Sequence, residues 1–247
     1  MHGCRFFAAR PGSRTGVGRY SVANSSVIDK QIATIEQAVS RVRSGSTILV
    51  GGFGDIGVPL RLIDALLATD VRDLTIIANN AGTGEKGLAM LFKHGRVSKL
   101  IASFPQQAGA DYFHREYTDG RVEVEIVPQG TLAERLRAGG AGIAGFFTPT
   151  AYGTDVAAGK ETRVIDGKGF VYEKGLRGDF AFIKAHKADR FGNLRYRLAS
   201  RNFNPVMAMA ADHTIVEVEA VVPLGAIDPD DVHTPGVFID AFVGPKE

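Results

Sequence analysis

Cysteine and long apolar segments are the scarcest features of this sequence. Its 247 residues include one cysteine, Cys4, which excludes a disulfide framework and every cysteine-rich metal cluster. No apolar run approaches the roughly 18 residues that cross a bilayer, because glycines interrupt even the stretch at residues 48–50. We therefore expect a soluble protein that is not secreted, holds no metal and does not interact with a membrane.

Concentrated positive charge is also missing once residues 1–27 are set aside. That segment holds four arginines and no acid, which leaves 25 of the 29 basic residues to face 27 acidic ones. A near-neutral body without a dense basic run lacks the electrostatic footprint of nucleic-acid binders. Residues 1–27 have the composition of an organelle transit peptide, or else form a disordered or processed extension. We expect one domain over residues 28–247.

Strand and helix patterns alternate along this domain. Apolar residues at three- and four-residue spacing predict a helix over 32–42, and the same spacing follows Pro59. The other predicted helices cover 88–92, 108–119, 131–137 and 205–211. The predicted strands cover 47–50, 74–78, 99–104, 122–127, 143–147, 170–172, 180–185, 214–221 and 237–242. Thr131 and Glu134 are spaced as a capping box that would start its helix. This alternation predicts a single α/β domain, a mostly parallel sheet with helices on both faces, with residues 151–169 as a polar excursion.

Glycines follow the first predicted strand at the spacing of a dinucleotide-binding turn. Gly52, Gly54 and Gly57 form G-x-G-x-x-G, but the next strand ends in Asn79 and Asn80 where an acid should hold the ribose. The sequence therefore disfavours a nicotinamide cofactor. Glycines also let a backbone approach a ligand or a neighbouring strand closely, and both interpretations stay open.

Three polar turns follow predicted strands, at residues 51–57, 79–82 and 128–130. In open α/β sheets, ligands bind outside the carboxyl ends of the strands, so these turns predict a binding crevice. The amides of Asn80 and Gln129 could hold a carbonyl or an oxyanion there. Asparagine often merely closes a turn and glutamine seldom does, which makes Gln129 the more informative residue.

A nucleophile is harder to find. The chain has no G-x-S-x-G elbow, and its histidines show no metal-ligand spacing. Glu85 follows Gly84 in a turn and is expected to be solvated, while the glutamates that alternate with valine at 123–125 and 217–219 are expected on wet strand faces. The residues thus predict a crevice without a reactive group, which is half of a site.

Several runs in register resemble family I coenzyme A transferases. They are S-G-S-T-I-L-V-G-G-F-G-D-I-G-V-P at 44–59, N-N-A-G at 79–82, V-P-Q-G-T-L-A-E-R at 127–135, R-A-G-G-A-G at 137–142, T-P-T at 148–150, K-A-H-K-A-D-R and G-N within 184–193, and A-S-R-N-F-N at 199–204. The likeness covers residues 28–243. It is to the A, or alpha, subunit of the 3-oxoacid branch. The S-E-N-G signature with the nucleophilic glutamate, which belongs to the B, or beta, subunit of that branch, is missing here.

The resemblance implies a mechanism and its residues. A glutamate of the B subunit would attack succinyl-CoA and carry CoA as a thioester to a 3-oxoacid, with CoA as substrate and no cofactor. Gln129 would support the oxyanion, and Asn79 and Asn80 would lie near the reacting carboxylate. The pocket would be bordered by Gly51, Gly52, Phe53, Gly54 and Gly130.

Substrate and assembly are expectations of the same kind. Residues 79–88, 103–105, 160–163 and 183–187 look more like the 3-oxoadipate branch than the acetoacetate branch, although Gln106 and Ala151 depart from its pattern. The family suggests two A and two B subunits. A separate A subunit resembles bacterial enzymes, which favours the cytoplasm over the mitochondrial matrix. Outside the family, the chain could be a stand-alone acyl-CoA or sugar-phosphate binding protein.

Overall fold

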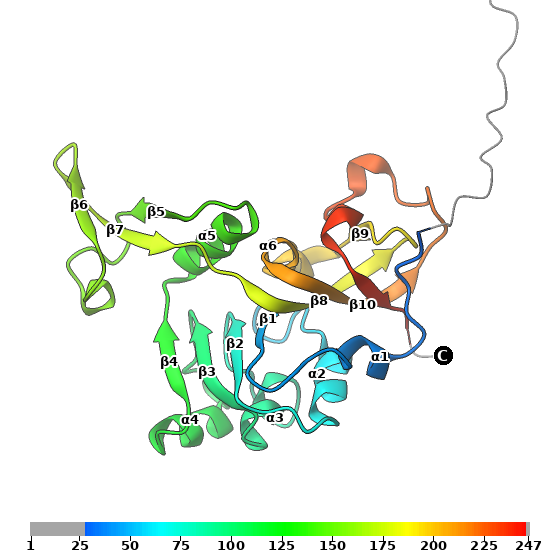
Figure 1. Ribbon diagram of the computed structural model, residues 1–247, viewed down its shortest axis with the longest axis horizontal. Helices are drawn as coiled ribbons and strands as arrows, with labels where there is room; N and C mark the ends of the chain where they lie inside the picture. Colours follow the sequence, from blue (N-terminus) through cyan, green and yellow to red (C-terminus); the bar gives the residue numbers. More distant parts are fainter. Residues whose placement is uncertain (1–27, 246–247) are drawn as a thin grey trace, which may run out of the picture.

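The computed structural model describes residues 28–245, so the extension predicted at residues 1–27 lies outside the described part of the chain. A mostly parallel sheet runs through the described residues (Figure 1). Its strands follow the order β11-β10-β8-β1-β2-β3-β4, and β9 pairs antiparallel with β8. The strands are β1 (Thr47–Val50), β2 (Leu74–Ala78), β3 (Val97–Ala102), β4 (Glu123–Ile126), β8 (Gly178–Ala188), β9 (Leu194–Arg195), β10 (Ala211–Val221) and β11 (Ala241–Val243). The predicted α/β class is confirmed.

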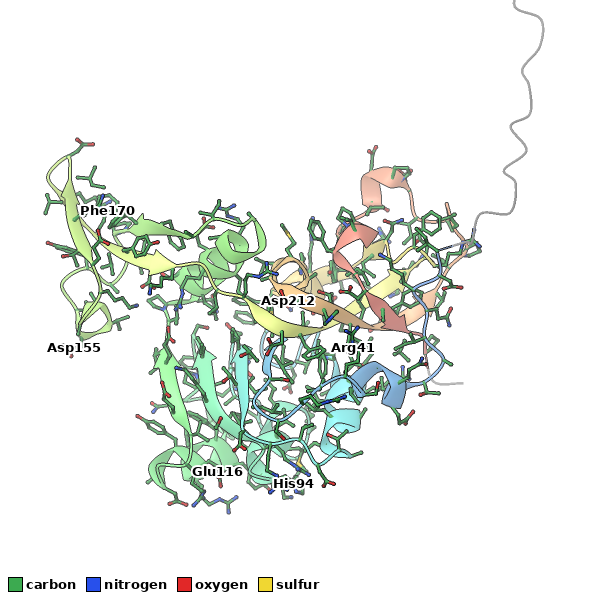
Figure 2. All side chains as sticks on the ribbon, in the orientation of Figure 1. Arg41, His94, Glu116, Asp155, Phe170 and Asp212 are labelled. Carbon is green, nitrogen blue, oxygen red and sulfur yellow. The ribbon has the colours of Figure 1, made fainter. Side chains whose placement is uncertain are left out.

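Helices cover both faces of this sheet, and side chains fill the layers between (Figure 2). One face packs α1 (Ile35–Val39), α2 (Leu60–Leu67), α3 (Leu88–Lys93) and α4 (Asp111–Thr118); the other packs α5 (Gln129–Gly140) and α6 (Asn204–Met209). Neighbouring strand residues take opposite sides, since Ile48 belongs to the first core and Leu49 to the second. Burial on both faces explains why the central strands read as continuous apolar runs. No helix of the described residues has the length and apolar character needed to cross a membrane.

A second, smaller sheet projects from this body (Figure 1). It is antiparallel, in the order β5-β7-β6, and Figure 2 labels Asp155 and Phe170 within this projection. Its strands are β5 (Gly145–Thr148), β6 (Thr162–Ile165) and β7 (Lys168–Lys174). The strands predicted at 143–147 and 170–172 therefore exist but do not join the main sheet, and the predicted polar excursion contains β6 and the 3-10 turn η1 (Asp155–Ala157).

Buried charges join the small sheet to the body. Arg135 of α5 is 8% exposed and bonds through Nη1 to a carboxylate oxygen of Glu125 at 2.6 Å and through Nε to the Lys174 carbonyl at 3.0 Å. Glu173 is 2% exposed and accepts from Lys160 Nζ at 2.7 Å. Because removing one partner of such a pair leaves a buried charge uncompensated, these contacts fix how the projection leaves α5.

Several predicted boundaries are wrong. The capping box at Thr131 does not form, because α5 begins at Gln129 with Pro128 as its N-cap, and Glu134 bonds to the guanidinium of Arg137 instead. The helix predicted over 32–42 is helical over Ile35–Val39, and the strand predicted over 237–242 is reduced to β11 because a 3-10 turn, η4 (Gly236–Phe238), precedes it. Two further 3-10 turns are η2 (Leu198–Arg201) and η3 (Pro229–Asp231). Gln129 and Gly130 thus open a helix and do not form a free turn.

The expectation of a wet face is also wrong for Glu217. This side chain is 5% exposed, and it accepts from the backbone N–H of Arg61, at the start of α2, at 2.8 Å. Lys184 Nζ lies 3.6 Å from its carboxylate. Glu219, two residues on, stays half-exposed and contacts His186 Nδ1 at 3.0 Å. Burial of Glu217 is tolerated because a backbone donor and a cation meet it.

His233 should make stability depend on pH. Its Nδ1 accepts from the backbone N–H of Tyr196 at 3.0 Å, which requires a neutral ring nitrogen. Burial first, and then Arg201 and Arg195, lower the pKa of His233 below its ordinary 6.5. The unfolded chain therefore binds this proton more readily, so the stabilisation is complete above pH 6.5 and is lost as the pH falls through the folded-state pKa.

We expect the urea midpoint of the protein to fall between about pH 7 and pH 5, and His233→Gln to flatten that part of the profile. Glutamine keeps an acceptor for Tyr196 and does not titrate. His114→Gln, at an exposed position on α4, is the matched control and should keep the wild-type profile. A profile unchanged by His233→Gln would contradict this assignment.

Candidate functional site

The predicted polar turns meet at one edge of the sheet. The parallel register sets β2 beside β1 and β3, and β3 beside β4, so their carboxyl ends lie together. Residues 51–57 leave β1, Asn79 and Asn80 leave β2, Ser103 leaves β3, and Gln129 follows β4. This confirms that the turns share one edge, where ligands bind in open α/β sheets.

Residues 51–57, the glycine-rich loop, form a closed turn. Phe53 and Ile56 exchange backbone hydrogen bonds of 3.0 and 3.1 Å, and the N–H of Gly51 donates to the carbonyl of Phe182 in β8. Gly52 and Gly57 have φ of 126° and 73°, which favour glycine. The loop leaves the Phe53 side chain 48% exposed, an unusual position for a large apolar group.

Asn79 links Gln129 to Ser103. Its side chain belongs to a residue that is 5% exposed, and its Oδ1 accepts from Gln129 Nε2 at 2.8 Å and from Ser103 Oγ at 2.8 Å. The backbone carbonyl of Asn79 accepts from the N–H of Phe104 at 2.9 Å. Within residues 28–245, no protein group accepts from Asn79 Nδ2. A bound oxygen could therefore take that donor and the second N–H of Gln129.

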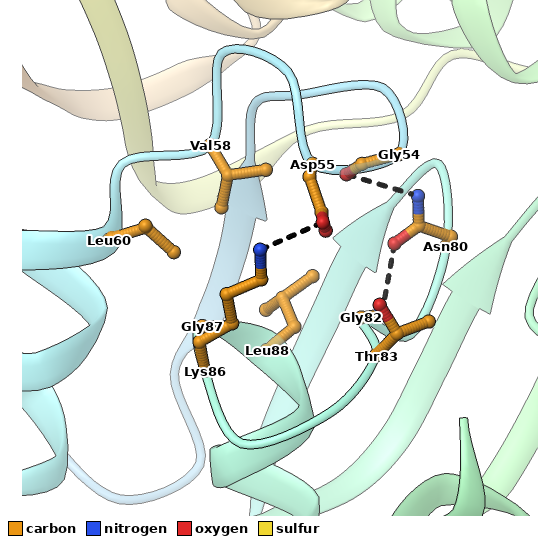
Figure 3. A pocket seen from close by; sticks show the side chains of 10 residues that line it. All are labelled: Gly54, Asp55, Val58, Leu60, Asn80, Gly82, Thr83, Lys86, Gly87 and Leu88. Carbon is orange, nitrogen blue, oxygen red and sulfur yellow. Dashed lines mark hydrogen bonds and ion pairs between the residues drawn. The ribbon is translucent and has the colours of Figure 1, made fainter. Parts of the chain in front are cut away.

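Asn80 has a different place from Asn79. Its Oδ1 accepts from the N–H of Gly82 at 2.9 Å and closes the turn, while its Nδ2 reaches the carbonyl of Gly54 at 3.5 Å (Figure 3). The simpler of the two interpretations, an asparagine that closes a turn, describes this geometry. Asn80 thereby ties the loop after β2 to the glycine-rich loop.

The hollow beside Asn80 is small. Its volume is about 20 Å³, close to the space of one water molecule, so it cannot contain an organic acid. Lys86 and Asp55 form an ion pair of 2.8 Å across it and join the same two loops (Figure 3). Both side chains are more than half exposed, so the pair adds little stability.

A larger pocket adjoins Gln129. Its volume is about 270 Å³, near the lower end of small-molecule pockets. It is lined by Phe53, Gln129, Gly130, Ala133, Asn202, Phe203 and Val206. Apolar groups form most of this wall, two amides provide polar groups, and no ionisable side chain is among them.

The start of α5 adds a favourable field to this pocket. Leu132 is the first residue of α5 whose N–H bonds within the turn, to the Pro128 carbonyl, so the N–H groups of residues 129–131 have no partner inside the helix. Partial positive charge at a helix N-terminus favours a neighbouring anion. Gln129 and Gly130 therefore combine side-chain and backbone donors at the pocket wall.

Sequence reasoning found one side of this pocket and missed the other. Asn202, Phe203 and Val206 come from the segment before and within α6, some 70 residues beyond Gln129 in the chain. Phe53, Gln129 and Gly130 are brought together as expected, whereas Gly54 and Asn80 line the small hollow. The A-S-R-N-F-N run was a signal of family likeness, but nothing local in it indicates a pocket.

No reactive side chain of the described residues lines the larger pocket. Its lining contains no carboxylate, thiol, hydroxyl or imidazole. Glu85 lies at the surface, where hydrogen bonds from Lys93 and Tyr112 lower its pKa. Within residues 28–245, no group of three or more His, Cys, Asp or Glu side chains is arranged to hold a metal ion. The pocket can bind and polarise a substrate but offers it no nucleophile.

Known proteins match nearly the whole described chain. Residues 32–244 match the family described as coenzyme A transferase. The chain is 55% identical over 217 residues to the A subunit of 3-oxoadipate CoA-transferase from Pseudomonas putida, covering 88% of this chain and 94% of that protein. It is 53% identical to the A subunit of succinyl-CoA:3-ketoacid coenzyme A transferase from Xanthomonas campestris, covering 82% and 83% respectively.

A solved structure shares the fold. The acyl-CoA transferase of Escherichia coli O157:H7, solved as a thioester complex with CoA, superposes with a TM-score of 0.78 at 22% identity. The match covers 88% of this chain and 47% of that one, so this chain spans about half the length of that enzyme.

Proposed function

The chain belongs to the coenzyme A transferase family, and from that membership we propose that it is the A subunit of an enzyme that moves CoA from succinyl-CoA to 3-oxoadipate. The observation that carries the proposal is the pair formed by Asn79 and Gln129, which offers N–H donors beside a pocket without a nucleophile. Such a site stabilises charge on oxygen and needs a reactive group from elsewhere. The relative from Pseudomonas putida is itself named as one of two kinds of subunit, which supports a B partner.

The chemistry divides between the two subunits. On the B subunit, a glutamate carboxylate oxygen attacks the thioester carbonyl of succinyl-CoA, the C–S bond breaks, and the CoA thiolate leaves an acyl anhydride. The thiolate then attacks the glutamyl carbonyl, which forms a glutamyl-CoA thioester and releases succinate. The carboxylate of 3-oxoadipate repeats these steps in reverse and departs as the CoA ester. A covalent carboxylate thus splits one difficult exchange into easier ones.

The residues of this chain act on the oxyanions. Each attack places negative charge on the former carbonyl oxygen, which the N–H groups of Asn79 and Gln129 would receive. The glycine-rich loop and Phe53 would border the acyl group, and the first turn of α5 would favour its charge. CoA is a substrate in this scheme, and neither metal nor redox cofactor takes part.

A second acceptor, acetoacetate, is the alternative. The two relatives differ by two percentage points of identity, so overall likeness does not separate the branches. Segments such as N-N-A-G-T-G-E-K-G-L at 79–88 favour 3-oxoadipate. The larger pocket favours acetoacetate, because its lining lacks a cation for a second carboxylate, and Gln106 stands where many oxoadipate relatives have arginine.

Assembly and location complete the proposal. The division of labour requires that the B subunit packs against the carboxyl edge of the main sheet, and we expect two A and two B chains. The relatives named above are bacterial, which supports a cytoplasmic location.

The test is a transferase assay on this chain alone and with its copurifying B subunit. Succinyl-CoA is offered with 3-oxoadipate or acetoacetate, and the new CoA ester is measured. We expect turnover from the pair alone, faster with 3-oxoadipate. Turnover by the isolated chain would contradict the half-site, preference for acetoacetate would support the alternative, and CoA-ester binding without exchange would indicate a stand-alone binding protein.

A further inference from the structure

We propose that Asn204 is a positioning residue that holds the glycine-rich loop in the shape the site needs. The inference rests on the proposed function for the loop's role, but its structural part stands on contacts within this chain. Asn204 opens α6, far from the loop in sequence, and it lines neither of the two pockets described above.

The Asn204 amide joins three segments. It is 0% exposed, and its Oδ1 accepts from the backbone N–H of Lys184 in β8 at 2.9 Å. Its Nδ2 donates to the carbonyl of Gly57 at 3.1 Å and to the carbonyl of Ser200 at 2.8 Å. A buried amide with every group satisfied is costly to disturb, so it fixes the end of the loop against β8 and η2.

Two glycines of the loop close directly on this amide. A Cβ on Gly51 would lie 1.9 Å from Asn204 Oδ1, and a Cβ on Gly57 would lie 2.9 Å from Asn204 Nδ2. Gly51 has no left-handed backbone, so contact with Asn204 accounts for its lack of a side chain. The loop therefore begins and ends against one side chain.

The residues around Asn204 carry its effect to the pocket. Asn202 Nδ2 donates to the carbonyl of Ile56 at 3.0 Å, and Asn202 and Phe203 line the pocket with Phe53 and Gln129. Loss of the Asn204 amide would let the loop move relative to Gln129. Displacement of about 1 Å in a positioned site can cost about 10²-fold in rate.

The kinetic test uses Asn204→Ala in the assembled pair. We expect kcat to fall by about 10-fold to 10²-fold, with a smaller change in KM, because the loop no longer holds the reacting geometry. Thr214→Val is the matched control, since Thr214 is 1% exposed and its Oγ1 donates to the Ala208 carbonyl, remote from the loop. It should lower thermal stability comparably and leave kcat within about twofold of wild type.

A steric exchange tests the contact itself. Gly51→Ala should destabilise strongly, because its methyl group overlaps Asn204, and adding Asn204→Ala should recover most of that loss in melting temperature. Activity should stay low in the double variant, because the space is restored but the hydrogen bonds are not. Additive losses in melting temperature would refute the contact.

A fluorescent reporter separates this proposal from the proposed function. The chain has no tryptophan, so Phe53→Trp places one fluorophore on the loop, and the spectrum of the wild-type pair is subtracted. Asn204→Ala should shift its emission and raise its quenching by acrylamide, and Thr214→Val should do neither. If the wild-type pair transfers no CoA, the proposed function fails while this readout still decides the positioning. An unmoved spectrum together with wild-type kcat in Asn204→Ala would overturn the inference.

Discussion

Replacing Gln129 with alanine should slow CoA transfer by the assembled pair by about 10²-fold or more, as the loss of an oxyanion donor typically does. Gln129 Nε2 spends one N–H on Asn79 Oδ1 at 2.8 Å, which orients the amide and leaves its second N–H for the substrate. Because the donor acts on charge that develops during reaction, kcat should fall more than KM rises.

Gln129→Glu sharpens the same test. It keeps the length of the side chain, but it replaces the donor with an oxygen that faces Asn79 Oδ1, so it should be at least as slow as Gln129→Ala. Gln37→Ala removes an exposed amide on α1, on the opposite face of the sheet, and should leave turnover unchanged. Coelution with the B subunit checks assembly. Full turnover in Gln129→Ala would remove this residue from the mechanism.

The sequence predicts this site to the extent that local pattern and sheet geometry determine it. Strands β1 to β3 are buried on both faces, so their apolar runs are unambiguous, and the rule for carboxyl ends then brings Asn79 near Gln129. The hydrogen bond between these two side chains joins residues 50 positions apart, and no periodicity encodes it.

The errors have physical causes that lie outside local pattern. Thr131 and Glu134 have capping-box spacing, but Thr131 is buried inside α5 and Glu134 has Arg137 as a nearer partner. Glu217 alternates with valine as a wet-face residue would, yet the N–H of Arg61 and the cation of Lys184 meet it in the core. In both cases a partner supplied by the fold overrides a valid local preference.

Asn79→Asp should be the most damaging conservative change in the chain, with turnover reduced by about 10³-fold against about 10²-fold for Asn79→Ala. Asn79 is 5% exposed, and no described group accepts from its Nδ2, so this atom is the free donor of the amide pair. Aspartate would replace that donor with a charged oxygen where the substrate carboxylates and the oxyanion must lie. Repulsion in a poorly solvated site then adds to the lost hydrogen bond.

The pH dependence of the two Asn79 variants separates charge from geometry. Lowering the pH protonates the introduced carboxyl, which removes the charge and returns one O–H donor, so Asn79→Asp should approach the rate of Asn79→Ala as the pH falls. Asn79→Ala should follow the wild-type profile at a lower level. Ser103→Ala provides the remaining control, because it removes the hydroxyl on the other side of Asn79 Oδ1 without touching Nδ2. Equal rates for Asn79→Asp and Asn79→Ala at every pH would mean that no negative charge develops beside this amide, and the donor role would then pass to Gln129 and the first turn of α5.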